Sequence, residues 1–322
     1  MPRDGLQRVD GIFMISMPKG STPNAALQAQ KLTARAIRER GRAGLPIAMV
    51  TAYDFTMARL LDEAGVDILL VGDSLGMTIQ GRTNTLGVTI EEICYHGRAV
   101  ARAATRAHVV GDMPFMSYET SPEKAVESAG RLVKEGDFES VKLEGGLDVA
   151  EHIRRIARAG IPVMAHVGLT PQRVLALGGF RVQGRGHADA DRIVADARAV
   201  EEAGAYAVVL EAVPPDVAAR VTESVGIPTI GIGAGSACGG QVLVCTDLLG
   251  MSRGRVPRFV RQFAELGDAI VRAAEQFVAE VRSRAFPTAE QSYRPNESPE
   301  PKAAEGLDHA TLATAGDESH RA

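Results

Sequence analysis

The stretch ILLVGDSLG, residues 68 to 76, has the pattern that decides the fold of this chain. It is a short apolar run that ends in an acid, Asp73. The same pattern recurs in HVVGDMPF with Asp112, in SVKLEGG with Glu144 and in AVVLEAVP with Glu211. Parallel strands of α/β proteins end in this way, because their bodies are buried and their carboxyl ends present functional groups at one rim of the sheet. The recurrence therefore predicts a parallel α/β protein with an acidic active site.

Strand and helix patterns alternate along the middle of the chain. Strands are expected at 46–51, 67–72, 108–112, 140–144, 162–166, 207–211, 227–232 and 241–244. Amphipathic helices are expected between most of them, at 55–64, 90–104, 122–134, 150–159 and 190–203, and several are followed by a glycine at the helix end. Eight strands that alternate with helices predict a (β/α)8 barrel, which uses about 250 residues as one unit.

The two ends of the chain differ in composition from its middle. Residues 1–28 are interpreted as a flexible leader, with Met14 or Met17 as a possible true start. Residues 29–287 are expected to form the barrel domain, including a long helix from about 258 to 285. Residues 288–322 are rich in Pro, Glu, Ser, Asn and Ala, which predicts a disordered tail.

Charge and cysteine content limit the classes of partner and compartment. The net charge of −4 produces no field suited to nucleic acid or to an anionic membrane, and no uninterrupted run of 18 apolar residues is present. The three cysteines have neither CxxC nor zinc-ligand spacing. We therefore expect a cytoplasmic protein with free thiols that acts on small molecules.

Three of the strand-end acids suit a metal site. Asp73, Asp112 and Glu144 offer hard oxygen ligands, which Mg²⁺ prefers. The alternative is that each acid caps a helix or pairs with a nearby arginine. Capping alone would use Ser, Thr and Asn as readily, so three acids at equivalent positions favour the metal interpretation.

Lys142 precedes Glu144 by two residues, so both side chains should point to the same face of their strand. An inward lysine can bind an anionic substrate, stabilise an enolate or form a Schiff base. The alternative is an internal ion pair with Glu144 or Asp112. The two interpretations are compatible.

Glu211 and His166 are the remaining candidates. The strand YAVVLEAVPP is apolar on both sides of its acid, and burial shifts the pKa of a carboxyl group toward the range of a useful general base. Glu211 is therefore the candidate base. His166, in PVMAHVGLTPQ, would bind a substrate oxygen or a water, with a purely structural role as the equal alternative.

Two glycine-rich stretches carry weaker signals. The run 231–235 follows a strand but has Ser236 where a dinucleotide-binding motif needs its last glycine. The acids in 184–191 stand where a helix is expected to begin, as the helix dipole favours. Neither stretch is assigned a cofactor.

Several motifs together resemble a known family. In order along the chain, they are TAYD (51–54), VGDSLGMTIQG (71–81), GDMPFMSY (111–118), VKLEGG (141–146), HVGLTPQ (166–172), GGFRVQGRG (178–186), LEAVP (210–214) and IGIGAG (230–235). The chain is similar in these motifs, from about 32 to 287, to ketopantoate hydroxymethyltransferases. The resemblance places its barrel in the phosphoenolpyruvate/pyruvate-type superfamily.

The resemblance implies an activity and its cofactors. The family transfers a hydroxymethyl group from 5,10-methylenetetrahydrofolate to 3-methyl-2-oxobutanoate through an enolate, and this yields 2-dehydropantoate for pantothenate biosynthesis. It implies one Mg²⁺ per subunit, surrounded by Asp73, Asp112 and Glu144, and Glu211 as the catalytic base. The substrate-binding residues that it implies are Asp73, Ser74, Asp112, Lys142 and His166.

Two alternative functions and one departure accompany the resemblance. A lyase like isocitrate lyase or phosphoenolpyruvate mutase would use a similar barrel, but the chain has no KxCGH-like catalytic run. A non-catalytic barrel that serves as a binding module is the minor alternative. Gly239 stands in SACGGQVLV where the family commonly has an aspartate. The resemblance also implies a ring-like homo-oligomer, typically a decamer.

Overall fold

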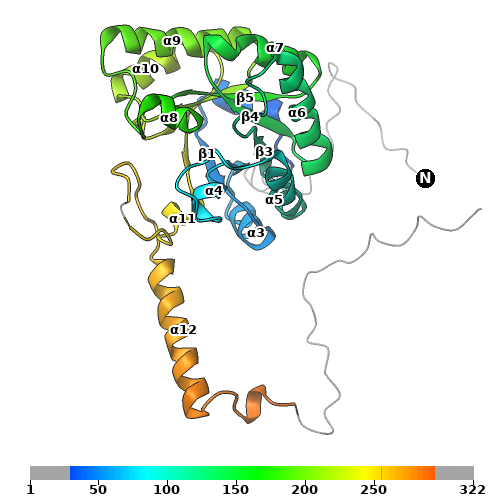
Figure 1. Cartoon of the computed structure of the whole chain (residues 1–322), viewed down its shortest axis with the longest axis vertical. Helices are drawn as coiled ribbons and strands as arrows, with labels where there is room; N and C mark the ends of the chain where they lie inside the picture. The colour runs from blue at the N-terminus through cyan, green and yellow to red at the C-terminus, as the bar shows by residue number, and fades with distance from the viewer. Residues whose placement is uncertain (1–29, 255, 294–322) are drawn as a thin grey trace, which may run out of the picture. The chain divides into compact units, whose positions relative to one another are not determined.

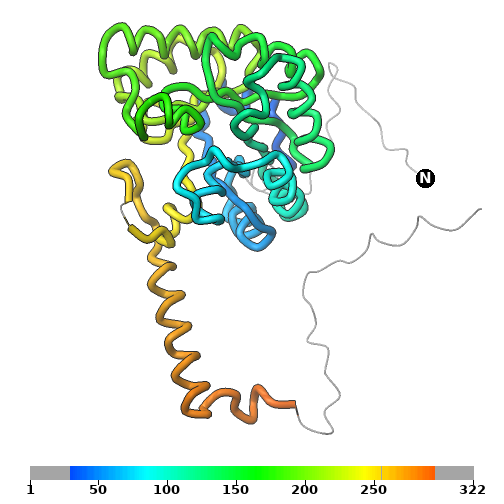
Figure 2. The backbone as a smooth tube through the Cα atoms, viewed as in Figure 1, coloured from blue at the N-terminus to red at the C-terminus, as the bar shows by residue number. Residues whose placement is uncertain are grey.

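The computed structural model describes residues 30–254 and 256–293, and its eight strands form one closed barrel. Every pair of neighbouring strands is parallel. Figure 1 shows the helices between residues 55 and 224 around these strands, and in Figure 2 the yellow backbone of the last strand returns beside the blue backbone of the first. The predicted (β/α)8 barrel is confirmed.

The strand bounds lie within two residues of the predicted ones. They are β1 Ile47–Thr51, β2 Ile68–Val71, β3 His108–Asp112, β4 Ser140–Glu144, β5 Val163–Gly168, β6 Ala207–Glu211, β7 Thr229–Ile232 and β8 Gly240–Leu243. The α-helices are α2 Ala34–Arg42, α3 Phe55–Glu63, α4 Leu75–Thr78, α5 Ile90–Ala103, α6 Pro122–Gly136, α7 Ala150–Arg158, α8 Val174–Leu177, α9 His187–Glu202, α10 Pro215–Ser224, α11 Cys245–Leu248 and α12 Leu266–Ser283. The 3₁₀ helices in the described residues are η1 Leu147–Val149, η2 Pro171–Arg173 and η3 Ala289–Gln291.

Local sequence accounts for these elements. All residues of β2, β3 and β4 are buried, as expected for parallel strands that helices cover on one side and the barrel core on the other. Thr89 begins α5 with a capping box to Glu92, and Ser121 begins α6 by accepting a hydrogen bond from the backbone N–H of Lys124. Hydrophobic burial and local capping therefore favour the same boundaries.

The amino-terminal end of the barrel interior contains a polar layer. The His108 Nε2 lies 2.8 Å from the Ser140 Oγ, which lies 3.0 Å from the Tyr206 hydroxyl. Met49, Val110 and other apolar side chains of the strands pack together in the barrel interior. This cluster is separate from the larger apolar core that includes residues of the surrounding helices. A filled interior at this end leaves the carboxyl ends of the strands for ligands.

Asp62 ties α3 to the turn that precedes β3. Its side chain accepts hydrogen bonds from the Thr105 N–H and hydroxyl, the Arg106 N–H and the Ala107 N–H, at 2.6 to 3.1 Å. Burial alone would raise the pKa of Asp62, but these hydrogen bonds outweigh burial and lower it. The carboxylate thus fixes the point at which the chain enters β3.

We expect Asp62→Ala to lower the free energy of unfolding by about 3 kcal/mol, because several buried donors would lose their acceptor. Denaturant unfolding measures the loss. Because the pKa is lower in the folded state, the wild-type advantage is present above about pH 4 and declines as the pH falls through the folded pKa. Glu63→Ala is the control, since Glu63 is exposed and pairs with Arg59, and an equal loss there would contradict the role of Asp62.

The last helix begins later than predicted. We expected a helix from about 258, whereas α12 begins at Leu266. The backbone N–H groups of Phe263, Leu266 and Gly267 instead donate to the carbonyls at the end of and after α11. These tertiary hydrogen bonds keep 258–265 out of the helix, so the predicted start was wrong.

The chain divides into two compact units after Gly267. The described part of the second contains most of α12, where the Phe277 and Phe286 rings meet edge to face at 5.5 Å, and η3. The predicted leader, and the tail beyond residue 293, lie outside the described residues, so the predicted domain bounds stay predictions. Among the described residues, no helix has the length and apolar character needed to cross a membrane.

Candidate active site

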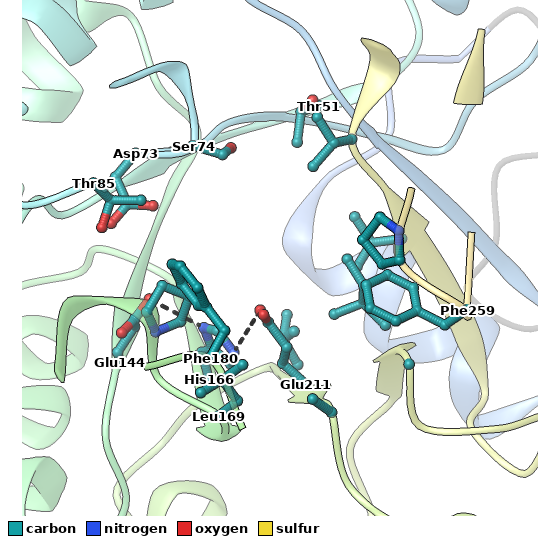
Figure 3. A pocket seen from close by; sticks show the side chains of 18 of the residues that line it. Thr51, Asp73, Ser74, Thr85, Glu144, His166, Leu169, Phe180, Glu211 and Phe259 are labelled. Carbon is teal, nitrogen blue, oxygen red and sulfur yellow. Dashed lines mark ion pairs between the residues drawn. The ribbon is translucent and has the colours of Figure 1, made fainter. Parts of the chain in front are cut away.

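One cavity of about 720 Å³ at the carboxyl ends of the strands collects every predicted site residue. These residues are Asp73 and Ser74 after β2, Asp112 on β3, Lys142 and Glu144 on β4, His166 on β5 and Glu211 on β6. Figure 3 shows Asp73 and Ser74 on one side of the cavity and Glu144, His166 and Glu211 on another. Side chains that are far apart in sequence therefore share one chamber.

The register of the barrel explains how they meet. Asp112 pairs with Lys142 across β3 and β4, and Glu144 pairs with His166 across β4 and β5. Because side chains alternate along a strand, Lys142 and Glu144 both face the interior, as predicted. Two neighbouring cross-strand pairs of polar side chains result, Asp112 with Lys142 and Glu144 with His166.

Lys142 and Asp112 form the tightest contact of the site. The Lys142 Nζ lies 2.6 Å from the Asp112 Oδ1, and both side chains are almost fully buried. Burial lowers the pKa of Lys142, but the charges of Asp112, Glu144 and Asp73 outweigh burial and raise it. Lys142 thus stays cationic, and the ion pair foreseen as an alternative is present beside the cavity.

Asp73 has the least favourable environment for a charge. Burial, followed by the charges of Asp112 and Glu144, raises its pKa well above the ordinary value. Its backbone N–H donates to Asp112 Oδ2 at 3.2 Å, and its Oδ2 accepts from Gln172 Nε2 at 3.0 Å. Three buried carboxylates here face one lysine, so a cation would relieve their repulsion.

His166 stands between two carboxylates. Its Nδ1 lies 3.5 Å from the Glu144 Oε1, and its Nε2 lies 3.4 Å from the Glu211 Oε2, as the dashed lines in Figure 3 mark. Burial and Lys142 lower the pKa of His166, but contacts with Glu144 and Glu211 outweigh them and raise it to about 9. The imidazole is therefore a cation at neutral pH, although neither contact has good hydrogen-bond geometry.

Glu144 and Glu211 differ in exposure. Burial would raise the pKa of Glu144, but His166 and Lys142 outweigh it and lower that pKa. Glu144 Oε1 is buried without a hydrogen-bond partner. Glu211 is less buried than its apolar strand suggests, with 20% of its side chain exposed. Its carboxylate can therefore reach a molecule in the cavity.

The backbone around Glu211 is held on both sides. The next residue, Ala212, has a φ of 46°, in the left-handed region that alanine seldom adopts. Its N–H donates to the Ile232 carbonyl and its carbonyl accepts from the Gln183 N–H, each at 2.9 Å. Such strain persists where the surroundings over-determine the conformation, and here it aims Glu211 at the cavity.

Gln172 and Tyr118 organise the acids, and our sequence analysis gave them no role. Gln172 donates from Nε2 to Asp73 and from its backbone N–H to the Glu144 Oε2, each at 3.0 Å. Its Oε1 accepts from the Tyr118 hydroxyl at 2.8 Å. The signal in the sequence was the position of Gln172 directly after Pro171 at the end of HVGLTPQ, where η2 turns the chain over the site.

Ser74 lies at the cavity wall with its side chain already engaged. The Ser74 Oγ lies 2.8 Å from the Tyr53 hydroxyl, and Ser74 precedes the short helix α4. One hydroxyl hydrogen of the pair remains to be directed at a ligand, because two hydroxyls need only one donor between them. The expected contact of Ser74 with substrate stays a prediction.

The donor set fits Mg²⁺ bound by few protein ligands. In residues 30–254 and 256–293, no three His, Cys, Asp or Glu side chains are arranged to hold an ion unaided. Mg²⁺ usually takes one or two carboxylates and completes its shell with water and substrate oxygens. The excess of buried acids suits such an ion, as does the Glu144 Oε1, which accepts no hydrogen bond from the described residues.

The chain is similar to known proteins over most of its length. The profile of a family described as ketopantoate hydroxymethyltransferase matches residues 31–289. A 3-methyl-2-oxobutanoate hydroxymethyltransferase of Anaeromyxobacter sp. (strain Fw109-5) is 55% identical over 262 residues, covering 80% of this chain and 86% of the relative. A protein of the same name from Syntrophus aciditrophicus (strain SB) is 51% identical over 266 residues, covering 83% and 98%.

Solved structures share the fold at much lower identity. Phosphonopyruvate hydrolase in complex with oxalate and Mg²⁺ is 15% identical with a TM-score of 0.53, covering 80% of this chain and 93% of that one. A 2,3-dimethylmalate lyase of the PEP mutase/isocitrate lyase superfamily is 18% identical with the same TM-score, covering 83% and 93%. At these identities the likeness shows the barrel fold alone.

Proposed function

The chain belongs to the ketopantoate hydroxymethyltransferase family, and we propose that its cavity transfers a hydroxymethyl group from 5,10-methylenetetrahydrofolate to 3-methyl-2-oxobutanoate. The products are 2-dehydropantoate and tetrahydrofolate, in pantothenate biosynthesis. One water is consumed, because a methylene carbon leaves as hydroxymethyl. The observation that carries the proposal is one cavity in which Glu211 faces a buried lysine and three buried acids.

Glu211 is proposed to remove the proton from C3 of the 2-oxo acid. Its carboxylate is partly exposed to the cavity, and the cationic His166 lies 3.4 Å away. That imidazole attracts the carboxylate and orients it, while Glu144 holds the imidazole from the other side. The proton passes to the Glu211 carboxylate, and the electron pair becomes the enolate.

Lys142 is proposed to stabilise the developing negative charge. Lys142 remains cationic beside Asp112 and is preorganised to stabilise the enolate oxygen. Mg²⁺ would be held among Asp73, Asp112 and Glu144, with one or two of these carboxylates as direct ligands and the rest acting through water, and when bound it would supply Lewis-acid polarisation of the keto group. C3 of the enolate then forms the new carbon–carbon bond to the one-carbon unit. The two bonds from that carbon to the folate nitrogens break, the nitrogens take up protons as tetrahydrofolate leaves, and the consumed water supplies the oxygen of the new hydroxyl group.

Exchange of the C3 proton with solvent deuterium tests the first half of the reaction. We expect NMR to show exchange from 3-methyl-2-oxobutanoate with Mg²⁺ and not after chelation, and dehydropantoate once methylenetetrahydrofolate is added. A folded protein that binds Mg²⁺ but gives neither would refute the proposal. It would direct attention to lyase-type substrates.

Gln172→Leu tests the residue that holds two of the acids. We expect the Mg²⁺ concentration for half-maximal exchange to rise about 10- to 100-fold, as for other residues that orient ligands from behind. The measurement is an exchange titration with MgCl₂, with thermal unfolding recorded in parallel. Gln262→Leu, at an exposed position, is the control. An unchanged midpoint in Gln172→Leu would leave that residue with a structural role alone.

The family resemblance supports two further proposals, one on assembly and one on location. We propose that the protein is a homo-oligomer of ten copies and that it acts in the cytoplasm. Light scattering coupled to size exclusion measures the mass of the assembly. A monomeric protein would refute the first proposal.

A further inference from the structure

The cavity is larger than the 2-oxo acid requires. Its volume is about 720 Å³, within the range of roughly 300 to 1,000 Å³ that holds drug-sized ligands. The acids, Lys142 and His166 occupy the part formed by the strand ends, where a small branched acid would react. The remaining volume is bounded by loops that the mechanism has not used.

Two phenylalanines line this remaining part. Figure 3 shows Phe180 near Glu144 and His166, and Phe259 on the other side of the cavity beyond Glu211. Phe180 is 50% exposed and Phe259 is 43% exposed, although both line the cavity. Exposed aromatic faces in a cavity suit a flat ligand that can stack on them.

The fold positions the loop of Phe180 and the ring of Phe259. Phe180 follows α8 and two glycines of positive φ, and its loop is tied back by the Gln183 N–H, which donates to the Ala212 carbonyl. Phe259 packs against Gly233, where an added Cβ would lie 2.8 Å from the ring. The glycine-rich stretch 231–235, to which the sequence assigned no cofactor, thus makes room for an aromatic wall.

Two arginines stand beside the phenylalanines. Arg181 and Arg258 line the same cavity and are exposed. Within the described part of the chain, neither guanidinium has a carboxylate at ion-pair distance, whereas Arg173 pairs with Asp148 and Arg220 with Asp191. Cationic forks without a protein partner suit the carboxylates of a ligand.

We propose that these four residues form the folate subsite, with the folate rings between Phe180 and Phe259 and its glutamate carboxylates on Arg181 and Arg258. This inference rests on the proposed function, which requires a folate in the same cavity. The rings would lie next to the reacting acid, because the one-carbon unit is carried where the pterin joins the aminobenzoyl group. The negatively charged tail would point away from the acidic cluster, as charge complementarity requires.

Calorimetric binding of tetrahydrofolate to Phe180→Ala and Phe259→Ala tests the aromatic walls. We expect each variant to bind about tenfold more weakly, in line with the loss of one stacking ring, and to show a matching rise in KM for methylenetetrahydrofolate. Exchange of the C3 proton, which needs no folate, should stay at the wild-type rate. Phe263→Ala is the matched control, because Phe263 lies in the same loop but does not line the cavity.

A ligand lacking the glutamate tests the arginines. Wild type should bind tetrahydrofolate about fivefold more tightly than tetrahydropteroate at low salt, and Arg181→Gln combined with Arg258→Gln should bind the two alike. Arg261→Gln, on the same loop and stacked over Phe263 at 4.9 Å, should keep the wild-type preference. If only the double variant loses the preference for tetrahydrofolate over tetrahydropteroate, the folate glutamate binds at Arg181 and Arg258.

The outcomes separate this subsite from the proposed function. Wild-type tetrahydrofolate affinity in both phenylalanine variants, or an equal loss in Phe263→Ala, would overturn the subsite. Failure of the wild-type protein to bind tetrahydrofolate would overturn it as well. If tetrahydrofolate binding follows the predicted pattern but no C3 exchange occurs, the subsite stands and the proposed reaction fails.

Discussion

Glu211→Gln is expected to slow exchange of the C3 proton of 3-methyl-2-oxobutanoate by about 100- to 10,000-fold. An amide of nearly the same shape fills the space of the carboxylate but cannot accept the proton. Glu211 pairs with His166 at 3.4 Å, whereas Lys142 pairs with Asp112, so the contact between Lys142 and Asp112 should survive the substitution. Mg²⁺ and 2-oxo acid binding should therefore change little.

The measurement is deuterium exchange followed by NMR, with binding of the 2-oxo acid and Mg²⁺ measured by calorimetry. Glu223→Gln is the matched control, since Glu223 is exposed on α10. Exchange at the wild-type rate in Glu211→Gln would show that another group removes the proton. Lost binding together with lost exchange would mean that Glu211 helps to hold the substrate.

Asp73→Asn should abolish most of the stimulation of C3 proton exchange by Mg²⁺ without lowering the folding stability of the metal-free protein. The half-saturating Mg²⁺ concentration for exchange should rise at least about 100-fold. This is more than the loss usually caused by substituting a residue that only hydrogen-bonds to a metal ligand. The raised pKa of Asp73 means that the folded state holds its proton more tightly than the unfolded chain does. Ionisation above the unfolded pKa therefore costs folding free energy, and asparagine avoids that cost while still accepting from Gln172.

Thermal unfolding with and without MgCl₂ separates these two effects. Wild type should unfold at a higher temperature with Mg²⁺ than without it. Asp73→Asn should show no such rise, and its unfolding temperature without Mg²⁺ should equal or exceed that of wild type. Asp216→Asn, at an exposed position in the first turn of α10, should behave as wild type. A full Mg²⁺ response in Asp73→Asn would remove that residue from the metal site.

The barrel was predictable because its signals are local and repeated. Buried parallel strands are apolar throughout, so runs such as 68–71 stand out between amphipathic helices. The start of α12 was not predictable in this way. Its N-terminal boundary depends on hydrogen bonds from Phe263 and Leu266 to carbonyls at the end of α11, and no local pattern encodes such contacts.

The site was predictable to the extent that strands position it. Parallel topology brings the ends of β2, β3, β4 and β6 together, so acids at those ends were expected to meet. Gln172 and Phe259 lie on turns and loops whose paths are set by tertiary contacts, such as the close approach of Phe259 to Gly233. Residue type alone did not distinguish them from other surface positions.

The barrel closes by pairing its first strand, β1, with its last, β8. During synthesis β1 leaves the ribosome well before β8 has been made, so its hydrogen-bonding edge stays unpaired until then. Until Gly240 emerges to pair with Ile47, the nascent sheet keeps two open edges lined by apolar strands. Closure brings together segments from opposite ends of the barrel sequence, and such distant pairings form slowly. The newly made chain should therefore depend on chaperone protection during synthesis, and truncation before β8 should yield aggregates rather than a smaller folded protein.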